Sequence, residues 1–476
     1  MSTPSDQRPD ILMIMPDQMR GDCLSMENHP VLQTPNIDTI GAQGMHFTRA
    51  YSTCPSCIPA RRAMLTARYP ATNGMVGYRM HEEFTQPTFP GQLGSAGYHT
   101  TLVGRGMHQH PEDRPYGYQD RTASFPDFDS GSYAEALEHK FPGEGGVAGH
   151  GISANGWSAR SWQFPDTWHP TTWGANRAGE KMKEAPVKYP HFITASFVAP
   201  HPPFIPPACY YERYLQSDLP PRAIGDWAVL PADDLLCPVD CNRINLQGDA
   251  LRQAQAGYFG LIAHLDDQVH RMVFDFKRQC RQRGRPWVIL FMADHGEMLG
   301  DHYLFRKCEP YDASARVPFL IQGSPEMGFV EGGRYDQPVC LEDIGPTLIE
   351  LAGGEPMENV DGRSLVPILR GESQPLREVL HGEHAPCYDK EQAFHMLTDG
   401  LMKFIWRPES GTEQLFDLSA DPQECTNLAV KEEHAAEVTR WRDQLITQLK
   451  DRPEGFTDGE RLIAGRPYHD LLPTKI

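Results

Sequence analysis

The sequence predicts an α/β protein with a large, mostly parallel sheet flanked by helices and a smaller α+β subdomain. Two observations predict this class. Apolar runs of strand length alternate with helical segments over most of the chain, which is typical of a parallel sheet covered on both faces. After about Pro375 the pattern changes to short strand-like runs. One large and one small domain suit a chain of 476 residues, so we place the domains at 1–375 and 376–476.

The strands of the large sheet are predicted from apolar runs. Ile11–Met15 is apolar throughout, as expected for a strand buried on both faces of a parallel sheet. Further strands are expected at His99–Val103, Phe192–Val198, Val288–Met292 and Val317–Ile321.

Two helices have clear signals. One begins at Thr34-Pro35-Asn36, where Thr34 can cap and Pro35 fits the first turn. The other is long, from about Leu246 to Arg281. Residues Tyr116–Lys188 are rich in Gly, Pro, Trp and His with weak periodicity. We therefore expect long loops there, which is where substrate selection often resides.

The C-terminal subdomain is predicted from three short strand-like runs followed by a charged helix at about Lys431–Lys450. The tail, Gly465–Ile476, has no regular pattern. The strand-like runs are Ala393–Thr398, Met402–Trp406 and Glu413–Asp417.

The composition argues against several classes of protein. With 44 basic and 63 acidic residues the formal charge is −19, whereas nucleic-acid binding needs a basic surface. No window approaches the roughly 18–20 apolar residues that span a bilayer, and Met1–Asp10 has no apolar signal core. We therefore expect a cytoplasmic protein with no nucleic-acid and no membrane partner. The eleven cysteines are scattered, which does not predict a disulfide scaffold.

Polar residues directly follow two predicted strands. Asp17 follows the first strand, and Asp294 and His295 follow Val288–Met292. Because ligands bind beyond the carboxyl ends of strands in open α/β sheets, these side chains suit a divalent cation. Mostly oxygen ligands favour Ca²⁺, Mg²⁺ or Mn²⁺ over zinc. The alternative is that each aspartate only caps the helix after its strand.

A second candidate site is the run Cys54-Pro55-Ser56-Cys57-Ile58-Pro59-Ala60-Arg61. Pro59, near the start of a helix-forming run, places Cys57 at a helix N-terminus, where free N–H groups favour an anion. Arg61 is one turn further on and can reach the same anion. Two other interpretations stay open: a redox pair of Cys54 and Cys57, or a buried structural thiol.

The segment Cys57-Ile58-Pro59-Ala60-Arg61, with Leu65-Thr66 downstream, resembles the C-x-P-S/A-R signature of the type I sulfatases. Other segments resemble motifs of that family in the same order, from about residue 10 to 450. The resemblance implies the alkaline-phosphatase-like fold, with 1–375 as the catalytic domain, and hydrolysis of sulfate monoesters. The other segments are Pro16-Asp17-Gln18, Thr34-Pro35-Asn36-Ile37-Asp38, Ala293 to His302, Leu415-Phe416-Asp417-Leu418, Asp421-Pro422 and Asn427-Leu428.

In that family the cysteine is oxidised to formylglycine, so the resemblance implies a nucleophile made from Cys57. One hydroxyl of the hydrated aldehyde, its pKa lowered by the metal, would attack sulfur, and the second would release the sulfate. The implied cofactors are this modification and one divalent metal ion, Ca²⁺ first, with Mn²⁺ or Mg²⁺ as alternatives.

The resemblance also implies a metal site and an arginine beside it. Formylglycine-57, Asp17, Asp294 and His295 would hold the metal, and Gln18, which lies nearby, is counted among the metal ligands. Arg61 would steady the diol and neutralise charge.

Two further residues would serve the transferred group and the leaving group. Lys307 resembles the family lysine that contacts the transferred group, although alone it would be taken for a surface lysine. His201 follows the Phe192–Val198 strand and could protonate the leaving oxygen. Alone it would be taken for a loop histidine packed among prolines.

The chain departs from the family after the third strand. Gly104-Arg105-Gly106-Met107-His108 stands where many sulfatases have G-K-W-H or G-K-M-H. Arg105 stays charged, so it could bind and orient the substrate but could not act as an acid. The leaving-group acid is therefore either His108 or His201.

The first turn departs as well, because many sulfatases have paired aspartates where this chain has Asp17-Gln18. The related phosphonate monoester hydrolases share this pair, the Asp294-His295 pair and the spacing to Lys307. A phosphonate monoester or phosphodiester hydrolase is therefore the alternative function. A third option is a glycan-binding relative that never converts Cys57.

The implied partners are a sulfate ester substrate and a formylglycine-generating enzyme for maturation. The alcohol is a sugar or an aryl or alkyl group, and the loops rich in Trp, Tyr and His favour a sugar. A homo-oligomer is left open by the sequence.

Overall fold

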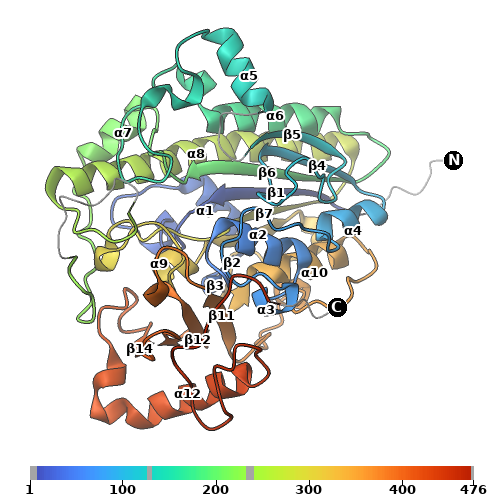
Figure 1. Cartoon of the computed structure of the whole chain (residues 1–476). Helices are drawn as coiled ribbons and strands as arrows, with labels where there is room; N and C mark the ends of the chain where they lie inside the picture. The colour runs from blue at the N-terminus through green and yellow to red at the C-terminus, as the bar shows by residue number, and fades with distance from the viewer. Residues whose placement is uncertain (1–7, 126–130, 232–240, 473–476) are drawn as a thin grey trace.

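A large sheet forms the centre of the molecule (Figure 1). The structure, a computed structural model, describes residues 8–125, 131–231 and 241–472. The sheet has eight strands in the order β5-β4-β6-β1-β7-β8-β2-β9. The first five strands in this order, from β5 to β7, run parallel to one another. Strand β8 is antiparallel to both of its neighbours, and β9 is parallel to β2. The predicted fold class is confirmed. The strands are β1 (Asp10–Asp17), β2 (Met45–Phe47), β4 (His99–Arg105), β5 (Asp120–Phe125), β6 (His191–Pro200), β7 (Trp287–Met292), β8 (Phe319–Gly323) and β9 (Gly333–Tyr335).

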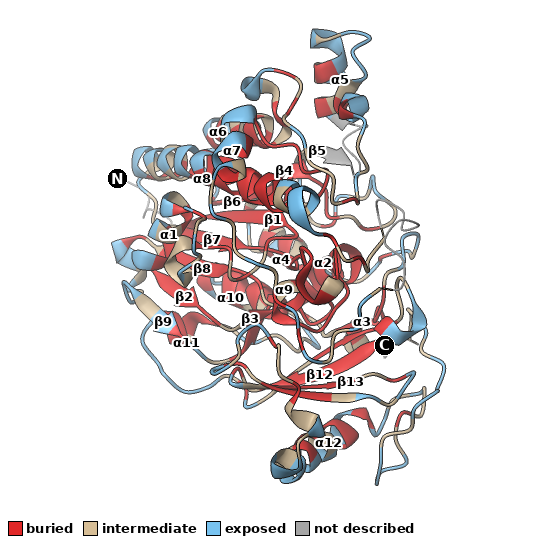
Figure 2. Cartoon of the chain, turned by 90° about the vertical axis from the view of Figure 1, so that its left-hand side faces the viewer, coloured by how far each residue is buried: buried red, intermediate tan, exposed pale blue. Residues whose placement is uncertain are grey.

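The five predicted apolar runs all form strands of this sheet. The central strand, β1, is buried along its whole length, because helices cover both faces of the sheet (Figure 2). One face carries α1 (Pro35–Ala42), α6 (Pro170–Glu184), α7 (Ala208–Leu215) and α8 (Gly248–Arg283). The other carries α2 (Cys57–Thr66), α4 (Phe89–Ser95) and α10 (Ile344–Leu351).

Both predicted helices are present, but α1 is capped differently from the prediction. The Thr34 side chain bonds Ser25 and Asp38 rather than the helix N–H groups. Instead, the carboxylate of Asp266 on α8 accepts from the N–H groups of Asn36 and Ile37. A residue 230 positions away along the chain thus caps the helix, a contact that sequence spacing does not predict.

The prediction of long loops over Tyr116–Lys188 is wrong in part, because this region contains β5, α5 (Gly131–Lys140) and α6. The buried face of α6 is made mostly of small residues, so its apolar periodicity is weak. Gly174 shows why: a Cβ there would lie 3.2 Å from the ring of Phe197 on β6. The helix packs too closely on the sheet for large side chains.

The C-terminal subdomain is a four-stranded antiparallel sheet covered by α12 (Ala435–Leu449). The three predicted strands and the helix are confirmed. The fourth strand, β11, was not predicted because its sequence, LHGEH, is mostly polar. The domain boundary at 375/376 stays a prediction. The strands are β11 (Leu380–His384), β12 (Phe394–Thr398), β13 (Met402–Trp406) and β14 (Glu413–Asp417).

Shorter elements connect these parts, and the tail returns to the large domain. Backbone bonds join Val76 to Asp470 and Leu472 to Gly74. Within the described residues, no helix is long and apolar enough to cross a membrane. The connecting elements are β3 (Ala50–Tyr51), β10 (Val339–Cys340), α3 (Pro70–Asn73), α9 (Asp312–Ala315) and α11 (Val366–Leu369).

A buried histidine joins two of the helices on the sheet. His264 of α8 lies 3.0 Å from Oγ1 of Thr172 on α6. Burial, and then the charge of Arg271, lower the pKa of His264 from 6.5 to about 3. Between pH 6.5 and pH 3, His264 binds a proton in the unfolded chain but not in the folded protein. Stability should therefore fall as the pH decreases from 6.5 towards 3.

Replacing this residue should reduce the pH dependence of stability. For His264→Gln, the loss of unfolding free energy between pH 7 and pH 5 should be about 2 kcal/mol smaller than for the wild type. Urea unfolding at both pH values measures the difference. His270→Gln, at an exposed position on the same helix, should leave the loss unchanged. If His264→Gln and the wild type lose the same unfolding free energy between the two pH values, His264 is not a neutral, buried side chain in the folded protein.

Candidate active site

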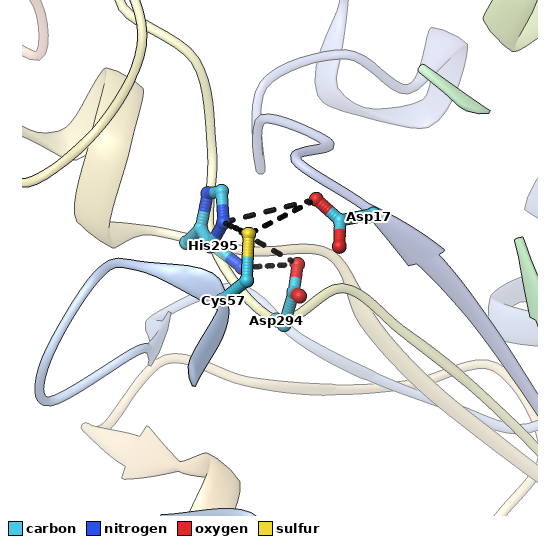
Figure 3. A group of neighbouring side chains, drawn as sticks. All are labelled: Asp17, Cys57, Asp294 and His295. Carbon is cyan, nitrogen blue, oxygen red and sulfur yellow. Dashed lines mark hydrogen bonds and ion pairs between the residues drawn. The ribbon is translucent and has the colours of Figure 1, made fainter. Parts of the chain in front are cut away.

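Four predicted residues from three parts of the chain meet at the carboxyl edge of the sheet. Asp17 ends β1, Asp294 and His295 follow β7, and Cys57 begins α2. One ligand atom from each lies within 4.8 Å of the others, and all four residues are buried. Figure 3 shows the side chains pointing toward one another. The structure thus brings together the residues that the sequence assigned to a metal and to the nucleophile.

Cys57 lies at the centre of this cluster. Its Sγ is 3.2 Å from Nε2 of His295 and 3.0 Å from Nζ of Lys307. Burial alone would raise the pKa of the Cys57 thiol, but Lys307 and His295 hold it well below its usual range. Cys54 and Cys57 are both free, which is also the state of a reduced redox pair, so this observation does not decide the redox alternative. Burial also raises the pKa of Cys54, which disfavours a reactive thiolate.

Arg61 connects the two buried carboxylates. Its Nη2 is 2.8 Å from Oδ2 of Asp17 and its Nε is 2.7 Å from Oδ2 of Asp294. It is wholly buried and also donates to the carbonyl of Gly106. The guanidinium therefore lies where it can neutralise the charge of both carboxylates, whereas its contact with a diol stays a prediction.

The donor set fits a divalent cation. Two carboxylates and an imidazole are present, and oxidation of Cys57 would place oxygen where sulfur now lies. Burial and the neighbouring Asp17 raise the pKa of Asp294, which indicates repulsion between the carboxylates that a cation would relieve. Asp17, Asp294, His295 and the oxidised residue 57 could therefore hold the ion.

Lys307 is buried beside Cys57 and is not a surface lysine. It is only 4% exposed, and its Nζ contacts Oε1 of Gln18 at 2.9 Å and Nε2 of His201 at 3.0 Å. Its neighbours Arg306 and Cys308 both have left-handed backbones, with φ of 71° and 68°. These strained turns project the lysine toward Cys57. The amide of Gln18 faces Lys307, and its assignment as a metal ligand stays a prediction.

The two candidate acids both line the site. Nδ1 of His201 lies 2.6 Å from the carbonyl of Pro202, so Nε2 is left to accept from Lys307. Burial, and then the charge of Lys307, lower the pKa of His201 to about 4. Nδ1 of His108 lies 3.3 Å from Nη2 of Arg105. The choice between the two histidines stays open.

Arg105 is anchored at the same carboxylate as Arg61. Its Nη1 donates to Oδ2 of Asp17. Although burial alone would raise it, Arg105 and Arg61 hold the pKa of Asp17 below its usual range. Gly104 brings Arg105 close to β6: its φ is +88° and a Cβ would lie 2.0 Å from the carbonyl oxygen of Ser196. Only glycine fits there.

A cavity of about 500 Å³ opens onto Cys57. Most of its outer wall is apolar or aromatic, and it includes residues 147–155 from the region expected to select the substrate. The C-terminal subdomain supplies Tyr388. The outer wall includes Tyr78, Met80, Val147, Ile152, Pro203 and Tyr388.

Sequence reasoning missed two supporting contacts. Oγ of Ser56, the residue before Cys57, lies 2.7 Å from Nε2 of His384 on β11. No sequence signal joins two residues 328 positions apart. Glu297 is buried beside Gln18. It belongs to the segment from Ala293 to His302, which resembles one of the sulfatase motifs, and this was the signal available for it.

The chain matches the family model described as Sulfatase over residues 9–354, and the model described as N-sulphoglucosamine sulphohydrolase, C-terminal, over residues 300–452. It is 33% identical over 482 residues to an arylsulfatase of Clostridium perfringens, with 98% of this chain and 99% of that protein covered. It is 26% identical over 452 residues to a choline-sulfatase of Rhizobium meliloti, with 89% and 82% covered. A solved phosphonate monoester hydrolase of Agrobacterium radiobacter superposes with a TM-score of 0.78 at 24% identity, with 97% of this chain and 100% of that chain covered.

The chain belongs to the sulfatase family of the alkaline phosphatase superfamily. It has the alkaline-phosphatase-like fold and is a sulfuric ester hydrolase. The family, fold and enzyme class implied by the sequence motifs are confirmed.

Removing Arg61 should destabilise the metal-free protein. Arg61→Ala leaves the buried Asp294 without its arginine and Asp17 with Arg105 alone, so the free energy of unfolding should fall by about 3–5 kcal/mol. A divalent cation should stabilise this variant more than the wild type, because it would neutralise the same carboxylates. Urea unfolding in chelator and in Mn²⁺ or Ca²⁺ measures both effects.

The neighbouring arginine provides the control. Arg62 is also buried, but its guanidinium binds the Gln109 side chain and the Glu82 carbonyl. Arg62→Ala should respond to the cation no more than the wild type does. A fall of less than about 1 kcal/mol in the free energy of unfolding of Arg61→Ala in chelator would contradict this prediction. The buried carboxylates would then not depend on Arg61 for their stability.

Proposed function

We propose that this protein hydrolyses sulfate monoesters of small-molecule or glycan alcohols, with formylglycine made from Cys57 as the nucleophile. The observation that carries the proposal is the place of Cys57. It begins a buried helix within reach of two carboxylates, an imidazole and the Lys307 ammonium. A nucleophilic oxygen at this position would meet both a cation site and the groups that bind an oxyanion.

When present, the bound ion and formylglycine supply the nucleophilic oxygen and the charge that activates it. The remaining work falls to the side chains. Arg61 holds Asp17 and Asp294 in position. Lys307 and Arg105 line the cavity on the side of Cys57, where they would bind sulfate oxygens and stabilise charge that develops on them. His201 or His108 would carry the proton to the leaving oxygen.

The donor set bears on the choice of ion. Mostly oxygen ligands favoured Ca²⁺, Mg²⁺ or Mn²⁺ over zinc, and the family resemblance placed Ca²⁺ first. An imidazole is a less usual ligand for Ca²⁺ than for a transition metal, whereas Mn²⁺ accepts both carboxylate and imidazole. We therefore propose Mn²⁺ alongside Ca²⁺, with Mg²⁺ as a third candidate.

A phosphonate monoester or phosphodiester hydrolase is the second candidate. The transferred group of such an ester carries one negative charge, as a sulfate monoester does. The observation that favours it is the pairing of Asp17 with Gln18 and of Asp294 with His295. The cations of the site would bind either group, so we expect activity on both classes.

Several expectations rest on the sequence alone. These are maturation by a formylglycine-generating enzyme, the cytoplasmic location and the oligomeric state. The identity of the alcohol is likewise open between a sugar and an aryl or alkyl group.

The test is to produce the protein together with a formylglycine-generating enzyme and measure the mass of the Cys57 peptide. We expect the mass of an aldehyde in place of the thiol, and a higher kcat/KM for sulfate esters than for matched phosphonate esters. Cys57→Ala should lower kcat by on the order of 10⁴-fold or more, as loss of a nucleophile does.

Two results would count against the proposal. A much larger kcat/KM for the phosphonate ester would favour the second candidate. A peptide that stays entirely thiol, while a control sulfatase in the same cells is converted, would leave a binding protein on a sulfatase scaffold.

A further inference from the structure

Glu297 is a fully buried carboxylate to which the proposed chemistry gives no part. It lies on the loop after β7, and none of its surface is exposed. It does not belong to the four-residue cluster and does not line the cavity. A buried carboxylate is costly unless hydrogen bonds hold it, so its contacts indicate what it does.

Three donors reach the Glu297 carboxylate. Oε2 accepts from Nε2 of Gln18, and Oε1 accepts from the backbone N–H groups of Leu299 at 2.8 Å and Arg306 at 2.5 Å. All three donor residues have left-handed backbones, with φ of 65°, 50° and 71°, which residues other than glycine rarely adopt. The carboxylate thus bonds the backbone of two of these residues, Leu299 and Arg306, the second directly before Lys307, and the side chain of the third, Gln18.

The same carboxylate sets the orientation of the Gln18 amide. The amide nitrogen of Gln18 donates to Glu297, so it faces the carboxylate. The amide oxygen then faces Lys307 and accepts from its Nζ at 2.9 Å. With Sγ of Cys57 and Nε2 of His201, each at 3.0 Å, the ammonium has one acceptor for each of its three N–H groups.

We propose that Glu297 is a positioning residue that fixes Lys307 by two routes. One route passes through the Gln18 amide, and the other through the backbone of Arg306. Glu297 itself does not touch the substrate. The reaction that it serves rests on the proposed function, but the geometry that it controls does not.

Glu297→Gln tests this arrangement because it keeps the size of the side chain and replaces one accepting oxygen with an NH₂ donor. The oxygen of the new amide should accept hydrogen bonds from the two backbone N–H groups. The NH₂ group of that amide would then face the NH₂ group of Gln18. The Gln18 amide must then turn over and present donors to the Lys307 ammonium. We expect kcat for 4-nitrophenyl sulfate to fall about 10- to 100-fold, the range typical of residues that orient a ligand, with KM little changed.

An exchange variant separates this role from structural damage. In Glu297→Gln/Gln18→Glu, the carboxylate at position 18 can accept from both the new amide and Lys307. Most of the lost kcat should return, which repair of packing alone would not achieve. The exchange variant also tests the proposal if Glu297→Gln alone does not fold. Glu342→Gln is the control, because Glu342 is another fully buried carboxylate and accepts from Thr53. Its kcat should stay near that of the wild type.

Crystal structures of the wild type and Glu297→Gln give a readout without turnover. Nζ of Lys307 should move out of hydrogen-bond reach of the residue 18 amide. Unchanged Lys307 contacts would overturn the proposal whatever the activity, and so would an exchange variant no better than Glu297→Gln. If Lys307 moves as expected but the converted wild type cleaves no sulfate ester, the proposed function fails and the positioning role stands.

Discussion

The rest of the site depends on the pair of hydrogen bonds from Arg61 to the carboxylates of Asp17 and Asp294. Parallel strands β1 and β7 bring both carboxylates to one edge of the sheet, where neither meets solvent. Two buried like charges repel each other, and a planar guanidinium can bind both at once. Because Arg61 lies one turn into α2, these bonds also fix the beginning of that helix. Cys57 is therefore held beside the carboxylates.

The C-terminal subdomain holds the same residues from the opposite side. His384 on β11 bonds Ser56, and Gln392 donates to the backbone carbonyl of Lys307 at 3.3 Å. Burial lowers the pKa of His384 to about 4. The ring is therefore neutral near pH 7, with Nδ1 donating to Ala385 and Nε2 accepting from the Ser56 hydroxyl. The C-terminal subdomain thus supports both Lys307 and the segment that carries Cys57.

Charge explains how an acidic protein can bind an anion. The chain carries a formal charge of −19, yet Arg105 and Lys307 line the cavity at Cys57, and no carboxylate lines it among the described residues. The carboxylates of Asp17 and Asp294 are both engaged by arginine. In a water-poor site, fixed cations of this kind stabilise an oxyanion more than they would in solvent.

The sequence by itself determined the large sheet and the place of Asp17, Asp294 and His295 at its edge. Apolar runs mark strands buried on both faces, and polar residues directly after parallel strands must lie at one edge of the sheet. Tertiary structure alone decided the contacts between distant segments: Asp266 capping α1, His384 supporting Ser56, and Glu297 orienting Gln18. The packing of α6 through small residues belongs to the same group. Local spacing carries no record of such contacts, because they exist only once the sheet has brought the segments together.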